Sequence, residues 1–329
     1  MRTYNPLEKL KEKILSDGGF CNSHSHLDRA YSINEKDLDY TVYEQLHEKW
    51  KLVDEYKRNS SEEDYYNHIA LALFEQKNFG VTSCLSFIDL DEVCEERAIN
   101  AAIKAKKYAK EHLSIDFVIA CQTLKGVLNK SSRVLLEKNI EKFDVIGSLP
   151  AADSDIEKHL DVVLGWGKSL GKRVHVHVDQ LNKIEEIETE ILIDKISEHG
   201  MENMVTAVHS ISLACHPKQY RYNIYSKSKD VGLSFISCPS AWIDHRRTEA
   251  LSVTHNAVTP VDEMLRFGLT VSIGSDNIHD IYKPFSDGNM MTELRFLLES
   301  THCYNMKELC KIAGENGRTI IGLSDGTIS

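Results

Sequence analysis

The feature that most constrains the fold is a series of short apolar runs separated by longer amphipathic stretches. Most of the runs are rich in β-branched residues and are bounded by Gly, Asp or Pro, which is typical of buried parallel strands. Eight such runs occur in the 329 residues, at 19–28, 80–89, 116–124, 144–151, 173–180, 205–211, 232–240 and 270–277. We therefore expect eight strands that are buried on both faces.

The stretches between the runs show the spacing of amphipathic helices. Apolar residues recur three or four positions apart, with charged residues opposite, at 62–79, 92–110, 156–170 and 184–199. Asp153 or Ser154 is expected to cap the helix at 156–170, and an extra helix is expected at 43–58. Alternating strand and helix units predict an α/β fold, a single (β/α)₈ TIM-type barrel, with a two-domain doubly wound sheet as the alternative. We assign residues 1–17 to an N-terminal helical extension and residues 18–329 to the barrel.

The composition argues against several classes of partner. A net charge of −11 argues against nucleic acid, because phosphate binding requires clustered Lys and Arg. We find no apolar run long enough to cross a bilayer, and the charged N-terminal stretch lacks the apolar centre of a signal peptide. The eight cysteines are scattered without a CxxC pair, so neither a disulfide framework nor a Cys-based zinc site is indicated. We expect a cytoplasmic protein without membrane or nucleic-acid partners.

Polar side chains collect at the ends of four predicted strands, which meet at one mouth in a barrel of this kind. Because strand side chains alternate, His24, His26 and Asp28 share one face of the first strand. Ionisable groups on a buried face are costly unless something binds them, and imidazole and carboxylate are ligands of Zn²⁺ and Fe²⁺. The other strand ends carry His175, His177, Asp179, Gln180, His209, Asp276, Asn277 and His279. The convergence of these residues predicts a divalent-metal site.

Each residue alone also has a structural interpretation. The pair of His24 and His26 is as readily explained by burial, and His177 alone is typical of a hydrogen-bonded core histidine. Asp276 alone is typical of a helix cap or a loop residue. His175 points inward like His177 but lies about 7 Å deeper, which favours a buried, hydrogen-bonded role. The histidines on predicted helices are interpreted as surface or packing residues: His47, His68, His112 and His159.

Four stretches carry a resemblance to a known family: "HSHLD" at His24, "HVHVDQ" at His175, "VTAVHS" at Val205 and "IGSDNIHDIYKPFSDGNMM" at Ile273. On these residues the chain resembles the amidohydrolase superfamily and, within it, the bacterial cytosine deaminase and triazine hydrolase branch. The likeness extends from about residue 18 to residue 323, which is nearly the whole chain.

The resemblance implies a role for each of these strand-end residues. It implies one divalent metal ion, Zn²⁺ or Fe²⁺, which activates a water molecule. Asp276 would also take the proton of that water, and His209 would hydrogen-bond the nucleophile or the oxyanion-like atom that forms. The implied metal ligands are His24, His26, His177 and Asp276.

Substrate contacts are expected around the same mouth. Gln122, with Leu124 and Lys125 nearby, falls where the family contacts the ring amide of the substrate. Trp242 is a candidate ring-stacking wall, with plain packing as the alternative. Arg29 is expected to meet an anionic group, with Lys283 as a second candidate and a salt bridge from Arg29 to Asp280 as the structural alternative. Asn277 completes the expected substrate contacts.

Two departures from the family pattern affect these expectations. The accessory β-sandwich of the family is expected to be missing, so that the N-terminal helix or another subunit of a homo-oligomer would cover the flank of the barrel. Gln180 stands where cytosine deaminases have a proton-shuttling Glu, and an amide does not titrate near neutral pH. Gln180 would then orient the substrate, and Asp276 would handle both proton steps, with His209 or His279 assisting.

The sequence therefore predicts a metal-dependent hydrolase that acts on C–N bonds other than peptide bonds. The expected reaction is deamination of a small amino-substituted heterocycle that resembles a pyrimidine, a pterin or a triazine. One alternative is a cyclic amide hydrolase with Asp276 as its sole acid and base. The other is an inactive ligand-binding barrel, with Gln180 as the mark of lost activity.

Overall fold

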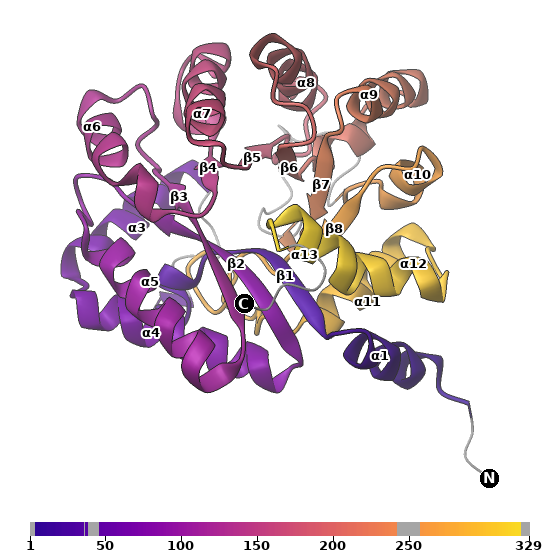
Figure 1. The fold of residues 1–329 in the computed structure, drawn as a ribbon, viewed down its shortest axis with the longest axis horizontal. Helices are drawn as coiled ribbons and strands as arrows, with labels where there is room; N and C mark the ends of the chain where they lie inside the picture. The colour runs from indigo at the N-terminus through magenta and orange to yellow at the C-terminus, as the bar shows by residue number, and fades with distance from the viewer. Residues whose placement is uncertain (1–3, 36, 39–45, 242–256, 324–329) are drawn as a thin grey trace.

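Eight short parallel strands alternate with helices in the computed structural model, which describes residues 4–35, 37–38, 46–241 and 257–323 (Figure 1). Each strand lies inside one of the eight apolar runs, so the predicted α/β architecture is confirmed. The strands are β1 (Phe20–Ser25), β2 (Val81–Asp89), β3 (Asp116–Gln122), β4 (Ile146–Ser148), β5 (Val174–Val178), β6 (Val205–His209), β7 (Ser234–Ser237) and β8 (Val271–Ile273).

The strands follow one another around a closed ring. Parallel pairing gives the orders β1-β2-β3 and β4-β5-β6-β7-β8. Two isolated parallel bridges join these groups, Ala120 with Val145 and Ser25 with Asp276. At the second bridge the Asp276 N–H donates to the His24 carbonyl oxygen at 3.0 Å, and the His26 N–H donates to the Asp276 carbonyl oxygen at 3.2 Å. The fold is a TIM-type barrel, and its closing seam runs through predicted site residues.

Helices surround the strands, as Figure 1 shows. The helical spacing of the sequence is confirmed, although the N-cap prediction for α7 is wrong. Asp155 is the cap and accepts the Lys158 N–H, because Asp153 is held by other partners. The helices are α1 (Pro6–Ser16), α3 (Leu46–Asn59), α4 (Glu62–Asn78), α5 (Arg97–Tyr108), α6 (Lys130–Asn139), α7 (Ile156–Leu170), α8 (Glu188–His199), α9 (Lys218–Asp230), α10 (Val261–Arg266), α11 (Met290–Thr301), α12 (Met306–Cys310) and α13 (Asn316–Ile320).

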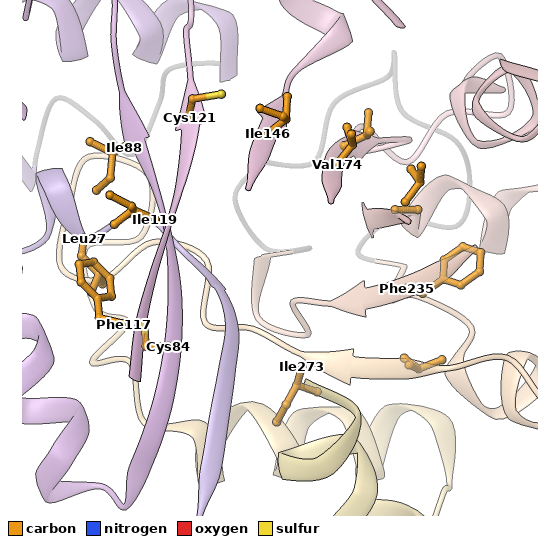
Figure 2. Packing of buried hydrophobic residues seen from close by; sticks show 14 of the residues in the cluster. Leu27, Cys84, Ile88, Phe117, Ile119, Cys121, Ile146, Val174, Phe235 and Ile273 are labelled. Carbon is orange, nitrogen blue, oxygen red and sulfur yellow. The ribbon is translucent and has the colours of Figure 1, made fainter. Parts of the chain in front are cut away.

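The core has an outer layer between strands and helices and an inner layer inside the barrel. Ile119 and Cys121 of β3 belong to the outer layer, whereas Val118 and Ala120 belong to the inner layer. Figure 2 shows part of the outer layer, which includes residues of β2, β3, β4, β5, β7 and β8. On β5 the three valines are in the outer layer, so the alternation turns its two histidines toward the barrel interior.

Helix α1 packs its buried Leu10 and Ile14 into the outer core layer. All eight strands in the described part of the chain belong to the barrel, and these residues contain no accessory β-sandwich. The division into an extension at 1–17 and a barrel at 18–329 stays a prediction. Among the described helices, none has the length and apolarity that a membrane crossing requires.

Strand β4 packs closely against β2 and β3 at Gly147, and a substitution there tests this packing. A Cβ atom at Gly147 would lie 1.9 Å from the Cys121 carbonyl oxygen and 2.5 Å from the Phe87 ring. We expect Gly147→Ala to lower the free energy of unfolding by at least about 2 kcal/mol, measured by urea denaturation. The matched control is Gly165→Ala on helix α7, where the new methyl group meets no heavy atom within 4 Å. We expect this substitution to raise the free energy of unfolding by about 0.5–1 kcal/mol. Equal effects of the two substitutions would contradict the packing at β4.

Candidate active site

The structure brings five of the predicted site residues together at the carboxyl ends of the strands. One group consists of His24, His177 and His209, and a second consists of His24, His26 and Asp276. Within each group the possible ligand atoms lie within 4.8 Å of one another. His24 is common to both groups, so all four predicted metal ligands and His209 surround one region at the barrel mouth.

An irregularity in the pairing of β1 turns its histidine, His24, toward the barrel interior. The pairing of β1 with β2 shifts register between Asn22 and Ser25. Cys21 before the shift lies in the inner core layer, and the Ser25 hydroxyl after it lies 3.6 Å from the outer-layer Cys84 Sγ. His24 therefore faces inward, with its ring centroid 4.8 Å from that of His177.

The expectation that Asp28 shares the face of His24 and His26 is wrong. Strand β1 ends at Ser25, and Asp28 belongs to a 3₁₀ turn, Leu27–Arg29. The Asp28 carboxylate accepts the Asp89 N–H at 2.9 Å and so faces the end of β2. Period-two alternation stops where the strand stops.

Two site residues have backbone conformations that L-residues rarely adopt. The φ angle of His209 is 76° and that of Asp276 is 59°, both in the left-handed region. The Thr259 hydroxyl stabilises the conformation of His209 by donating to the His209 carbonyl oxygen at 2.6 Å. The conformation of Asp276 is stabilised by its backbone hydrogen bonds to His24 and His26, which close the barrel. Strain of this kind persists only where the surroundings fix it, and it is common at functional sites.

The imidazoles of the site have buried nitrogens without protein partners. Both ring nitrogens of His24 and the Nδ1 atom of His26 have no hydrogen-bond partner. Asp276 Oδ1 lies 3.3 Å from the Nε2 atoms of both rings. His177 Nδ1 donates to the Ser148 carbonyl oxygen at 2.9 Å, which leaves its Nε2 unprotonated in the neutral ring. Unpartnered buried polar atoms around one carboxylate fit a divalent cation such as Zn²⁺ or Fe²⁺.

Burial keeps the imidazoles of His26, His177 and His209 neutral. It lowers the pKa values of His26 and His177 well below the ordinary value and the pKa of His209 to about 4. Burial alone would raise the pKa of Asp276, but contacts with His24 and His26 hold this pKa well below its ordinary range. The site therefore offers neutral nitrogen donors and one carboxylate near neutral pH, which is the protonation state that metal ligation requires.

A cavity opens from these residues toward solvent. Seven of the predicted site residues line it, namely His26, Arg29, His177, Gln180, His209, Asp276 and Asn277. The sequence did not predict two aromatic lining residues, Trp50 and Tyr282. Trp50 lies in the predicted extra helix, α3, and Tyr282 lies in the motif that follows the eighth strand. The remaining lining residues are Leu124, Leu149, Ile211 and Ala241.

Two predicted substrate contacts are not part of this lining. Gln122 is buried, its side-chain oxygen has no hydrogen-bond partner, and Leu124 lines the cavity at this strand end instead. Trp242 lies outside the described residues, directly after Ala241. The roles of Gln122 and Trp242 stay predictions.

Arg29 combines a place at the cavity with a buried ion network. Its guanidinium lies 3.2 Å from Asp89 and 3.5 Å from Asp280, so the predicted salt bridge to Asp280 is present. Lys57 adds a second cation 2.7 Å from both Asp89 and Asp91. Asn277 donates to the same Asp280 at 2.5 Å. The network holds Arg29 and Asn277 in place at the rim of the cavity, and it pairs the Arg29 guanidinium with carboxylates of the protein itself.

The remaining polar predictions divide clearly. The interpretation of His175 as a buried, hydrogen-bonded residue is confirmed, since its Nε2 donates to the Ile320 carbonyl oxygen at 3.2 Å. His279 donates from Nδ1 to the Pro284 carbonyl oxygen at 2.9 Å and does not line the cavity. Lys283 donates to the Ser240 carbonyl oxygen. His159, interpreted as a surface or packing residue, is instead hydrogen-bonded on both ring nitrogens.

No family model matches the chain. It is 43% identical over 260 residues to a protein of Haemophilus influenzae described as uncharacterized, a match that covers 78% of this chain and 94% of that protein. It is 23% identical over 282 residues to the N-isopropylammelide isopropyl amidohydrolase of Pseudomonas sp. (strain ADP), covering 83% of this chain and 66% of that protein.

Among solved structures, the chain is similar to 5-methylcytosine deaminase from Klebsiella pneumoniae liganded with 5-fluorocytosine. The TM-score is 0.84 at 23% identity, over 93% of this chain and 75% of that one. The chain therefore belongs to one family with the Haemophilus influenzae protein, and it shares the fold of 5-methylcytosine deaminase.

Proposed function

We propose that this chain is a metal-dependent hydrolase that removes an amino or substituted amino group from a small heterocycle. The observation that carries the proposal is the convergence of buried, partly unpartnered imidazoles and one carboxylate at the barrel mouth. The names of similar proteins support the substrate class, since one is a 5-methylcytosine deaminase and another an N-isopropylammelide isopropyl amidohydrolase.

Four residues would hold one Zn²⁺ or Fe²⁺: His24, His26, His177 and Asp276. When bound, such a cation lowers the pKa of a water molecule towards neutrality and so supplies a nucleophile. The outer contact of His177 with Ser148 supports this assignment, because it leaves Nε2 as the free donor atom.

Asp276 transfers the proton in this reaction, and His209 stabilises the negative charge that develops on attack. Asp276 is held as a carboxylate, so it accepts a proton from the attacking water and returns it to the departing amine. His209 is neutral, because burial lowers its pKa to about 4, and it donates an N–H to the negative charge that develops on attack. Gln180 cannot shuttle a proton and orients the ring from the cavity wall.

The cavity walls suit a flat, polar ring. Trp50 and Tyr282 supply aromatic surface, and Asn277 and Arg29 supply donors at the rim. Gln122 and Trp242 are further proposed contacts. Arg29 is already paired with Asp89 and Asp280, so we propose that it orients the rim as well as the substrate.

Gln180 favours a second candidate, hydrolysis of a cyclic amide, because Asp276 alone can serve as acid and base for that reaction. Product analysis separates the two. Release of ammonia or an amine with the ring intact supports deamination, whereas a new carboxylate supports ring opening. The test is a screen of aminated purines, pyrimidines, pterins and triazines, and of cyclic amides, with protein loaded separately with Zn²⁺ and Fe²⁺. A protein without near-stoichiometric metal and without turnover would instead be an inactive ligand-binding barrel.

His26→Ala and Asp276→Ala should each abolish metal binding and turnover, because each removes a proposed ligand. The metal content measured by elemental analysis should fall from about one metal ion per chain to background. Added Zn²⁺ should raise the melting temperature of the parent protein but not that of either ligand variant. His112→Ala, at an exposed position outside the barrel mouth, is the control and should retain metal and activity. Full activity of either ligand variant would show that the site is misplaced.

Gln180→Glu should create or raise activity on aminopyrimidines, because a carboxyl group at this wall can donate and recover a proton. A gain in kcat/KM of about tenfold or more is expected, because general acid–base catalysis typically contributes about 10²–10⁴-fold. Gln180→Asn keeps the amide and should give no gain. No change in Gln180→Glu would mean that residue 180 does not occupy the shuttle position.

A further inference from the structure

We propose that Asp153, His159 and Ser148 form a positioning array that fixes the imidazole of His177 for metal binding. The inference rests on the proposed function, in which His177 is a ligand. It extends that function to three residues that neither bind the metal nor line the cavity.

A continuous chain of hydrogen bonds links these residues to the site. His177 Nδ1 donates to the Ser148 carbonyl oxygen at 2.9 Å. The Ser148 hydroxyl lies 2.8 Å from His159 Nε2, and His159 Nδ1 lies 2.6 Å from Asp153 Oδ2. Ser148 is 2% exposed and His159 is 1% exposed, so water does not compete for these bonds.

The donor and acceptor of each hydrogen bond in the array follow from the chemistry of its side chains. A carboxylate only accepts, so His159 donates from Nδ1 to Asp153. With the N–H of the ring at Nδ1, Nε2 accepts a hydrogen bond from the Ser148 hydroxyl. Ser148 is the last residue of the three-residue strand β4, so its side chain anchors the peptide whose carbonyl oxygen orients His177.

Asp153 is itself anchored by a third segment. It accepts the Val127 N–H at 2.8 Å and the Leu128 N–H at 3.2 Å, in the loop after β3. A Cβ atom at Gly126 would lie 2.1 Å from Asp153 Oδ1, so this loop packs directly on the carboxylate. The array therefore ties the loop after β3, the end of β4 and helix α7 to a proposed ligand on β5.

The same order of residues, Ser–His–Asp, occurs in nucleophilic hydrolases. Here the Ser148 hydroxyl is buried and lies outside the cavity lining formed by the described residues. Its carbonyl oxygen, not its hydroxyl, reaches the site. The geometry therefore points to positioning, and outer contacts of this kind typically change metal affinity by about 10–100-fold.

The test compares His159→Phe with His199→Phe. The first removes both bonds of His159 with a ring of similar size. The second is the matched control, since His199 on α8 binds Asp161 on α7 at 2.9 Å but contacts no proposed ligand. Competition with a chromogenic chelator should show Zn²⁺ affinity at least about tenfold weaker in His159→Phe and unchanged in the control. Melting temperatures of the metal-free proteins report on structural damage.

Ser148→Ala is the second variant, should His159→Phe fail to fold. It removes only the hydroxyl, should weaken Zn²⁺ binding in the same direction and should alter the visible absorption spectrum of the Co²⁺-loaded protein. Unchanged Zn²⁺ affinity and an unchanged Co²⁺ spectrum in a folded variant would overturn the array and leave the proposed function intact. A parent protein that binds neither metal would overturn both.

Discussion

The structure depends on the placement of imidazole nitrogens and a carboxylate in a buried region at the mouth of the barrel. Such groups destabilise a core unless they are bound, because burial removes their hydrogen bonds to water. The Nε2 atoms of His24 and His26 each lie 3.3 Å from Asp276 Oδ1, at the point where the barrel closes, and the Nδ1 atoms of the same rings have no hydrogen-bond partner. A divalent cation bound at this point would offset that cost.

The surrounding fold holds the site in a fixed geometry. The seam between β1 and β8 uses the backbone of Asp276, and the strained conformations of His209 and Asp276 persist because hydrogen bonds fix them. The buried ion network around Arg29 and Lys57 stiffens the rim. Removing one member of such a network typically costs about 3–5 kcal/mol, because it leaves an uncompensated buried charge.

The barrel and the meeting of its polar strand ends follow from local patterns. Buried parallel strands appear as β-branched runs, and the alternation of β5 turns His175 and His177 inward. Contacts between distant segments leave no such pattern. The Asp89 N–H that binds Asp28 after the end of β1, the N–H groups of Val127 and Leu128 that hold Asp153 away from the α7 cap, and the link from His159 to Ser148 each depend on a partner that only the fold supplies. Trp50 and Tyr282 were missed for the same reason, since only the folded loops bring them to one cavity.

Anomalous X-ray diffraction from crystals of the metal-loaded protein, at energies around the zinc and iron absorption edges, tests the central claim most directly. The account predicts one peak per chain at bonding distance, about 2.0–2.2 Å, from nitrogens of His24, His26 and His177 and an oxygen of Asp276. A peak elsewhere, or no peak with these side chains several ångströms from any common point, would contradict it.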